Sequence, residues 1–222
     1  MINWQEINFV LLDMDGTLLD LHFDSYFWQT YVPLKYAQAH NIPLPAAQQY
    51  LSAETGKVMG QIQWYCLDYW TEKLKLPIVE LKKEIKHKIA LRPDTLPFLN
   101  ALRKSGKQVV LLTNAHPASL SLKIAQTGLD RHIDVLISTH VYGVTKESQL
   151  LWEKLQADLQ FDNESTLFVD DSLSILDSAK QFGIKHLLSV ANPDSQVPAL
   201  NEAQLRGYPG ITDYRDIINQ IN

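Results

Sequence analysis

The residues from Phe9 to Asp20 constrain the fold more than any other stretch of the chain. The apolar run Phe9-Val10-Leu11-Leu12 is followed at once by Asp13-Met14-Asp15-Gly16. Four consecutive apolar residues bounded by turn residues indicate a strand buried on both faces, as in a parallel sheet. Side chains two positions apart on an extended chain point the same way, so the two aspartates share one direction. Such a pair can bind a divalent cation or divide the roles of nucleophile and acid.

Two other interpretations of this stretch compete with that one. An Asp-x-Asp-Gly string also opens calcium-binding loops, but an EF-hand loop has its glycine at the sixth position. Here the glycine is at the fourth position and a core strand precedes it, so we discount calcium. The other interpretation is that Asp13 and Asp15 only cap and hydrate the end of a strand, because short motifs carry false positives. This stretch alone leaves that possibility open.

The rest of the chain divides into a helical insertion and an alternating α/β region. Residues 21–92 are aromatic-rich and helical in pattern, with expected breaks between helices at Pro33, Pro43, Pro45 and Pro77. From residue 93 onward, amphipathic helices alternate with the apolar runs Val109–Leu112, Val135–Ile137, Leu167–Val169 and His186–Val190. This pattern predicts an α/β fold, with a Rossmann-like parallel-sheet core at 1–20 and 93–222 and an inserted helical cap domain at 21–92. Residues 191–210 read as an irregular loop and residues 211–221 as a closing amphipathic helix.

Composition narrows the classes of function. The 222 residues carry a net charge of -5, with a pI of about 5.8, so no overall basic field favours nucleic acid. The single cysteine, Cys66, excludes an intramolecular disulfide and fits a reducing compartment. The sequence has no apolar run of 18 residues, and Met1–Glu6 lack a basic flank followed by a long apolar run, so we expect neither a transmembrane segment nor a secretory signal in it. We expect a soluble, cytoplasmic protein with neither a nucleic-acid partner nor a membrane partner.

The insertion is more basic than the rest of the chain, with nine Lys and Arg against six Asp and Glu. One interpretation is that its lysines help to receive an anionic substrate. The other is that they form a solvated helix face, which we favour because charge runs usually face water. The lysines concerned are Lys75, Lys82, Lys83, Lys86 and Lys88.

Polar side chains follow three further predicted strands. Thr113 and Asn114 end the second strand, a turn after the third leads to Lys146, and Asp170-Asp171-Ser172 ends the fourth. Each alone has an ordinary explanation as a helix cap, an exposed lysine or a pair of acids at a helix start. Ligands of open parallel sheets bind at the carboxyl ends of the strands. Because these three groups and the first acid pair all follow strands of one predicted sheet, together they predict one site for a phosphate and a metal.

These four groups, in this order, resemble the motifs of the haloacid dehalogenase-like superfamily of phosphohydrolases. The matching segments are Asp13–Leu18, Leu111–Asn114, Lys146 and Phe168–Ser172, and the insertion is similar to the small cap domain of that superfamily. Further segments resemble its bacterial GMP/IMP nucleotidase branch, among them Trp64–Trp70, Leu112–Pro117 and Asn192–Ser195. The resemblance implies a phosphoric monoester hydrolase of the 5′-nucleotidase type, whose partner is a purine nucleotide.

The resemblance also implies catalytic and phosphate-binding roles. Asp13 is expected to attack phosphorus and form an aspartyl-phosphate. Asp15 is expected to protonate the departing oxygen and then to deprotonate the attacking water. Lys146 completes the catalytic set, and Thr113, Asn114 and Lys146 would hold the phosphoryl group.

Mg²⁺ is the cofactor that the resemblance implies. Its ligands would be the Asp13 carboxylate, the Asp15 backbone carbonyl and Asp171, with Asp170 orienting a metal-bound water. The position at which the family often carries its second acid is Ile175 here. The division of labour between Asp170 and Asp171 therefore stays open.

Substrate specificity is expected in the insertion, whose aromatic residues could stack on a purine, although any single one is more often a core residue. These residues are Phe23, Tyr26, Trp28, Trp64, Tyr65, Tyr69 and Trp70. His116 and His140 could approach the site or be structural. A sugar-phosphate phosphatase or phosphomutase on the same fold, and a non-catalytic phosphate-binding protein, remain alternatives. A dehalogenase is disfavoured, because it would need neither the Asp15 acid nor a magnesium site.

Overall fold

Six strands form one sheet in the computed structural model, which describes residues 2–221. The strand order is β3-β2-β1-β4-β5-β6, and every neighbouring pair is parallel. The strands are β1 (Phe9–Leu12), β2 (Gln108–Thr113), β3 (Val135–Ser138), β4 (Thr166–Asp170), β5 (His186–Val190) and β6 (Gly210–Ile211). Five of them coincide with predicted strands to within a residue. The predicted α/β fold with a parallel sheet is confirmed.

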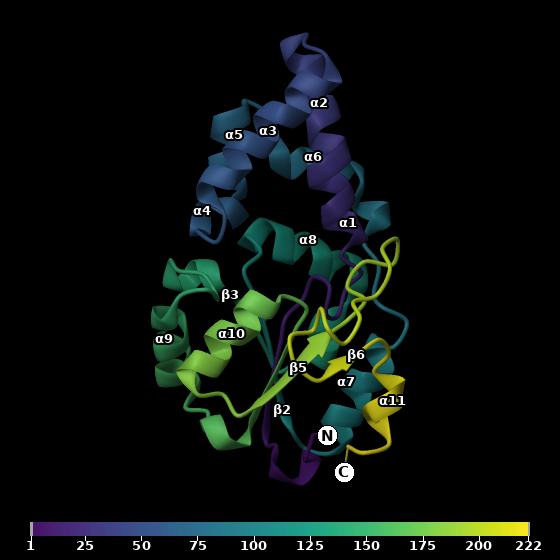
Figure 1. Cartoon of the computed structure of the whole chain (residues 1–222), viewed down its shortest axis with the longest axis vertical. Coiled ribbons are helices and arrows are strands. Elements are labelled where there is room, and N and C mark those ends of the chain that lie inside the picture. Colours follow the sequence, from purple (N-terminus) through teal and green to yellow (C-terminus); the bar gives the residue numbers. More distant parts are fainter. Residues whose placement is uncertain (1, 222) are drawn as a thin grey trace.

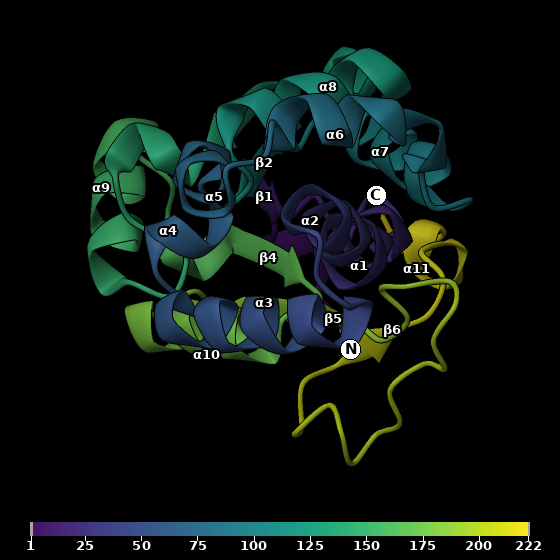
Figure 2. The same ribbon diagram turned by 90° about the horizontal axis from the view of Figure 1, so that it is seen from above.

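The central strand β1 is buried on both faces because helices cover the sheet from two sides (Figure 2). Val10 and Leu12 pack into one hydrophobic cluster, and Phe9 and Leu11 pack into the other. The first cluster includes residues of α7 (Thr95–Lys104), and the second includes residues of α9 (Gln149–Leu159) and α10 (Leu173–Phe182). The covering helices are α7, α8 (Pro117–Thr127), α9 and α10.

The helices of residues 21–92, here called the insert, lie together beyond the carboxyl ends of the strands (Figure 1). They are α1 (His22–Tyr26), α2 (Val32–His40), α3 (Leu44–Val58), α4 (Ile62–Tyr65), α5 (Leu67–Leu74) and α6 (Ile78–Glu84). The insert is helical, as the sequence pattern predicts. Its exact domain boundaries stay a prediction.

Pro33 does not break a helix, contrary to the sequence-based expectation. Residues from α1 to α2 are continuously helical, with a π-helical turn at Phe27–Tyr31 just before the proline. A proline inside a regular α-helix removes one hydrogen bond and clashes with the carbonyl four residues back, whereas a π turn changes that spacing. The other prolines lie at helix starts as expected: Pro43 and Pro45 begin α3, and Pro77 precedes α6.

The predicted closing helix at 211–221 is mostly wrong. Gly210 and Ile211 form the edge strand β6 against β5, and only Arg215–Ile218 are helical, as α11. Tertiary contacts account for the difference, because the backbone N–H of Tyr214 donates to Asp94 at 2.6 Å and the Tyr214 ring stacks on Phe98. Among residues 2–221, we find no helix that combines the length and the apolar character needed to cross a membrane.

Candidate active site

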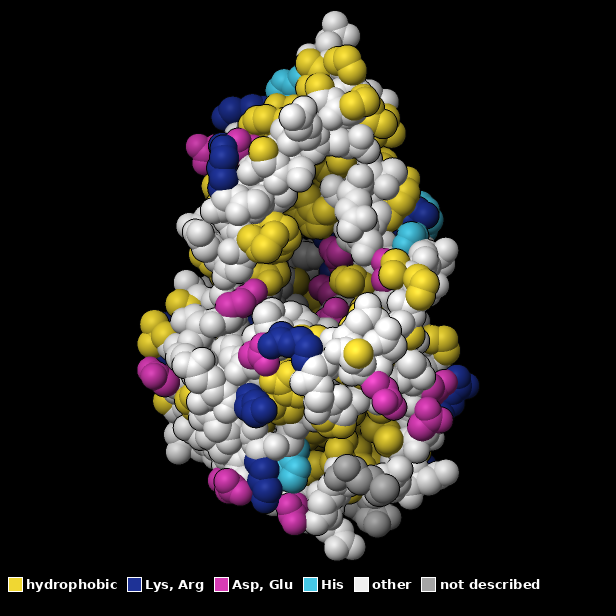
Figure 3. Space-filling model, viewed as in Figure 1, with side chains coloured by type: hydrophobic (Ala, Val, Ile, Leu, Met, Phe, Trp, Pro, Cys, Tyr) yellow, Lys and Arg dark blue, Asp and Glu magenta, His cyan; other side chains and the backbone are white. Residues whose placement is uncertain are grey.

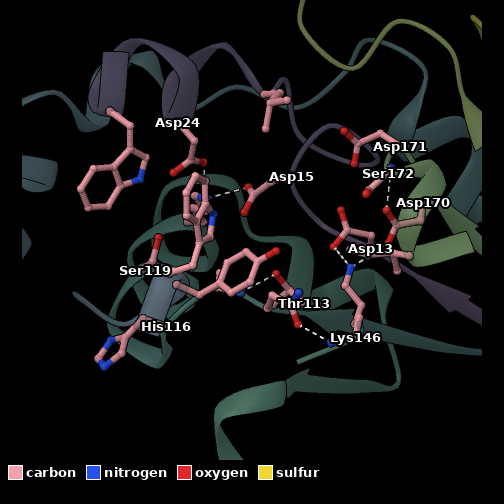
Figure 4. A pocket seen from close by; sticks show the side chains of 18 of the residues that line it. Asp13, Asp15, Asp24, Thr113, His116, Ser119, Lys146, Asp170, Asp171 and Ser172 are labelled. Atoms are coloured by element: carbon pink, nitrogen blue, oxygen red, sulfur yellow. Dashed lines mark hydrogen bonds and ion pairs between the residues drawn. The ribbon is translucent and has the colours of Figure 1, made fainter. Parts of the chain in front are cut away.

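A cavity of about 260 Å³ lies between the strand ends and the insert, and Figure 3 shows acidic side chains inside the hollow. β1, β2 and β4 are neighbours that end at one edge, so the residues that follow them meet there. The cavity is lined by all seven site residues predicted from the sequence: Asp13, Asp15, Thr113, Asn114, Lys146, Asp170 and Asp171. The structure therefore brings together four segments that are far apart in the chain (Figure 4).

Lys146 joins the first and fourth of these segments. Its buried ammonium contacts Asp13 Oδ1 and lies 2.7 Å from Asp170 Oδ2. Burial alone would lower the pKa of Lys146, but these two carboxylates outweigh burial and raise it above its usual range. Burial raises the pKa of Asp13 to about 6, against the opposing effect of the Lys146 ammonium. Lys146 is thus a fixed cation beside the carboxylate at the end of β1.

Asp170 and Asp171 differ in what surrounds them. Asp170 Oδ1 accepts the backbone N–H of Ser172 at 2.8 Å and its Oδ2 pairs with Lys146, so both oxygens have partners. Asp171 faces Gly16, where an added Cβ would lie 2.7 Å from the Asp171 carboxylate. Gly16 also has a φ of +84°, which an L side chain rarely adopts. The turn after β1 therefore needs glycine both for its conformation and for the approach of Asp171.

The carboxylates of Asp13, Asp170 and Asp171 form a cluster suited to a hard cation. One oxygen from each lies within 4.8 Å of the others. Burial, followed by the charges of Asp170 and Asp13, raises the pKa of Asp171 well above its usual range. A divalent cation would remove that repulsion, and oxygen ligands suit Mg²⁺. The donor set therefore fits magnesium.

Asp15 is held by residues that the sequence analysis did not assign to the site. Lys123 of α8 lies 2.6 Å from Asp15 Oδ1 and 2.5 Å from Asp24 Oδ2. Lys82 of α6 lies 2.5 Å from Asp24 Oδ1 and is 2% exposed. The preferred interpretation of Lys82 as part of a solvated face is therefore wrong. Its burial depends on α1 and α6 packing together, which no local pattern specifies.

Burial raises the pKa of Asp15 to about 6, although the Lys123 ammonium opposes the rise. A carboxyl group with a pKa in this range can hold a proton and give it up near neutral pH. These properties suit an acid that later acts as a base.

Thr113 and Asn114 organise the end of β2. Thr113 Oγ1 accepts the backbone N–H of Ala115 at 3.0 Å, which leaves the hydroxyl proton to be donated. Asn114 Oδ1 accepts from the Lys146 backbone N–H at 2.9 Å, and Asn114 Nδ2 donates to Glu147 at 3.0 Å. The Asn114 side chain thus ties the end of β2 to the segment that carries Lys146.

Of the seven aromatic residues considered for base stacking, three line the cavity: Trp28, Trp64 and Tyr65. Phe23 and Trp70 are buried in the core. A second cavity of about 410 Å³ lies within the insert, and its lining shares Leu21, Asp24, Trp28 and Trp64 with the first. Trp28 and Trp64 line both cavities, so their side chains lie where the two cavities adjoin.

His116 lines the cavity but serves as a helix cap. Its Nδ1 accepts the backbone N–H of Ala118 at 3.2 Å, and its Nε2 lies 3.4 Å from Asp68 of the insert. Cys66 lies close enough to complete a three-residue cluster with these two side chains. Because Nδ1 accepts a hydrogen bond, the ring proton of His116 is on Nε2. Nε2 is the atom that faces Asp68, and a protonated nitrogen cannot bind a metal, so this cluster does not suit a metal ion. His140 packs edge-on against His116, with ring centroids 5.0 Å apart.

The chain is similar to known proteins in sequence and in fold. A sequence model of the haloacid dehalogenase-like hydrolase family matches residues 7–183. Two proteins named GMP/IMP nucleotidase YrfG, from Escherichia coli (strain K12) and Shigella flexneri, are each 48% identical over 217 residues, covering 98% of this chain and 96% of the relative. The crystal structure of a HAD phosphatase from Thermococcus onnurineus has a TM-score of 0.76 at 22% identity, covering 96% of this chain and 97% of that one. At that identity the likeness to the crystal structure concerns the fold alone.

Proposed function

Because the chain belongs to the haloacid dehalogenase-like hydrolase family, we propose that it is a Mg²⁺-dependent phosphatase that hydrolyses the purine nucleotides GMP and IMP through an aspartyl-phosphate. The family expected from the sequence, and its implication that the chain is an enzyme, are confirmed by these matches. The observation that carries the proposal is the placement of Asp13 beside the Lys146 ammonium, with Asp15 two residues further on in the same cavity.

In the proposed first step, Asp13 attacks the phosphorus atom of the nucleotide. Asp13 Oδ1 is engaged by Lys146, so Oδ2 is the oxygen left to form the new bond to phosphorus. The bond from phosphorus to the 5′ oxygen breaks, and its electron pair stays on that oxygen. Asp15 supplies the proton that neutralises the leaving nucleoside. The covalent intermediate divides one difficult displacement into two easier ones.

In the second step, Asp15 takes a proton from a water molecule as the water attacks phosphorus. The bond from phosphorus to Asp13 breaks, which regenerates the carboxylate and releases inorganic phosphate. Thr113, Asn114 and Lys146 are the residues proposed to hold the phosphoryl oxygens through both steps. Two hydrogen bonds already order these groups: the Lys146 backbone N–H donates to Asn114 Oδ1, and the Ala115 backbone N–H donates to Thr113 Oγ1.

Mg²⁺ would be held by the carboxylates of Asp13 and Asp171 and by the backbone carbonyl of Asp15. Asp171 is favoured over Asp170 as the direct ligand, because both oxygens of Asp170 already have partners. Asp170 would then orient a metal-bound water and hold Lys146. When bound, the cation would neutralise charge that builds up between the phosphate and the acidic residues.

The insert is proposed to act as the cap domain that binds the nucleoside. Trp28 and Trp64 face the catalytic cavity and also the adjoining cavity within the insert, so they could stack on a base whose phosphate lies at Asp13. Carboxamides of Gln29 and Gln48 line the adjoining cavity and can donate to or accept from a purine. The purine preference comes from the named relatives, which are GMP/IMP nucleotidases.

The test is phosphate release from IMP, GMP, AMP, UMP and several sugar phosphates, with Mg²⁺ and with EDTA. Preference for the 6-oxopurine nucleotides that disappears with EDTA supports the proposal. Activity confined to sugar phosphates would keep the chemistry and reject the nucleotide assignment. Transfer to a sugar hydroxyl in place of hydrolysis would indicate a phosphomutase, and no turnover of any substrate would favour a phosphate-binding protein.

A further inference from the structure

Lys123 has a place in the cavity that the proposed chemistry does not yet use. It lies on α8, one helical turn after Ser119, and both residues are buried and line the cavity. Only 1% of the Lys123 side chain is exposed, and its ammonium contacts two carboxylates, one from the turn after β1 and one from the insert. Figure 4 labels these two partners, Asp15 and Asp24. A buried ammonium is costly unless it is paired, so its two carboxylate partners keep it in one position.

The same ion network continues into the insert. Asp24 on α1 bridges Lys123 and Lys82, with both distances 2.5 Å. The Lys82 ammonium also lies over the rings of Phe23 and Phe27, at 4.9 and 4.7 Å from their centroids. Two ammonium groups and two carboxylates therefore alternate from Asp15 to Lys82. The network joins the catalytic turn to two helices of the insert.

We propose that Lys123 is a positioning residue for Asp15, and that Asp24 and Lys82 hold Lys123 in place from the insert. Lys123 binds Asp15 Oδ1, so it fixes the rotation of the carboxylate and leaves Oδ2 to exchange a proton with the 5′ oxygen or with water. A misplacement of about 1 Å in such a group can cost roughly 100-fold in rate. This inference rests on the proposed function, because it assigns Asp15 the role of acid and base.

The proposal makes the position of the insert part of the acid–base chemistry. Lys123 belongs to the sheet-covering helix α8, whereas Asp24 belongs to α1 of the insert. The contact between them crosses from α8 to the insert as it is seated here. Asp15 is therefore held for proton transfer when the cavity is covered.

The test compares two substrates whose leaving groups differ in their need for a proton. A nucleoside alkoxide must be protonated as it leaves, whereas p-nitrophenolate leaves without a proton. Lys123→Met keeps the length of the side chain and removes the charge. For this variant we expect a rapid burst of about one nitrophenol per active site, then slow turnover, because only the second step needs Asp15 with this substrate. With IMP we expect no burst and a kcat lowered by roughly 100-fold.

Three further variants make the result specific. Asp15→Asn should behave like Lys123→Met, and Lys123→Arg should recover part of the rate. Lys107→Met removes another buried lysine, whose ammonium bonds the backbone carbonyls of Trp4 and Ile7 away from the cavity, and should leave both the burst and the turnover unchanged. If Lys123→Met slows the burst as much as the turnover, or changes only KM, the proposal is overturned.

If Lys123→Met does not fold, Asp24→Asn replaces it, since that substitution keeps the volume and removes the carboxylate that holds Lys123. A retained burst with slower turnover supports the proposal, and equal slowing of both overturns it. If the unmodified enzyme releases no phosphate from either substrate, the proposed function fails, and that result is separate from any difference among the variants.

Discussion

The Tyr65 hydroxyl donates a hydrogen bond of 2.8 Å to Oε1 of Glu147, the residue that follows Lys146. Glu147 Oε2 accepts from Asn114 Nδ2 at 3.0 Å, so one carboxylate connects the insert to the predicted phosphate-binding residues. Nearby, the Thr145 hydroxyl donates to the backbone carbonyl of Gly60 at 3.0 Å. These contacts hold the insert against the segment that carries Lys146.

Tyr65→Phe should weaken nucleotide binding, because it removes a hydrogen bond to a charged acceptor, which is worth roughly 1.5 to 3 kcal/mol. We expect KM for IMP to rise about tenfold or more while kcat changes little, since Tyr65 is not assigned to the chemistry. The matched control is Tyr142→Phe, which removes a hydrogen bond of 2.8 Å to Asp158 outside the cavity lining. Equal effects of the two substitutions on KM would contradict this account of Tyr65.

Removal of magnesium should abolish phosphate release, and Asp171→Asn should lower the affinity for Mg²⁺. Ligand binding to the folded state adds about 2.7 kcal/mol of stability at a ligand concentration 100 times Kd. We therefore expect Mg²⁺ to raise the Tm of the unmodified protein and to raise that of Asp171→Asn much less. A thermal shift by Mg²⁺ that is the same in both proteins would show that Asp171 is not a ligand.

Gly16→Ala should disturb the metal site more than its backbone strain alone would. The added Cβ would lie 2.7 Å from the Asp171 carboxylate and 2.9 Å from Pro193 Cβ. We expect the Mg²⁺ concentration for half-maximal activity to rise by roughly 10-fold to 100-fold. Gly143→Ala is the control, because Gly143 has a φ of +70° but open space around it. That control should cost about 1 kcal/mol of stability and leave the magnesium response unchanged.

Asp24→Asn should destabilise the fold in a manner that depends on pH. Burial alone would raise the pKa of Asp24, but the ammonium groups of Lys123 and Lys82 outweigh it and hold this pKa well below its usual value of 3.8. The carboxylate therefore contributes its full stabilisation above that value and loses it as the pH falls toward the lower, folded-state pKa.

At pH about 7 we expect Asp24→Asn to lower the free energy of unfolding by about 3 kcal/mol, because it leaves buried ammonium groups underpaired. The difference between the two proteins should shrink at pH about 3, because the unfolded unmodified chain binds a proton at Asp24 there, whereas the folded protein keeps the charge. Urea unfolding of both proteins at both pH values measures this difference in the free energy of unfolding. A difference that stays constant would refute the assignment of this stabilisation to the Asp24 charge.

The predictable part of the site lies at the ends of the strands. Asp13, Thr113 and Asp170 each follow or end an apolar run, and parallel strands bring their carboxyl ends to one edge whatever the rest of the chain does. Lys146 was predictable only through its order among these motifs. The structure adds the contacts of Lys146 with two carboxylates, which distinguish Asp170 from Asp171.

The unpredicted part depends on packing between elements. Lys82 and Lys123 read locally as ordinary helix lysines, and only the approach of α1 to α6 and α8 buries them against Asp24. Lys123 lies four residues after Ser119, so both are on the buried face of α8. A charged residue on that face was the one signal in the sequence that could have identified Lys123. The segment after Gly210 was mispredicted for a related reason, since pairing with β5 overrode its helical pattern.

In the proposed mechanism, Asp13 carries the phosphoryl group during turnover. The most direct measurement is acid quenching of the enzyme in the presence of IMP and Mg²⁺, followed by mass spectrometry of its peptides. We expect one added phosphoryl group on the peptide that contains Asp13, and none in Asp13→Asn. With p-nitrophenyl phosphate, whose leaving group needs no proton, Asp15→Asn should hold more of this group than the unmodified enzyme. Rapid phosphate release with no phosphorylated peptide in the unmodified enzyme, or undiminished release by Asp13→Asn, would contradict this role of Asp13.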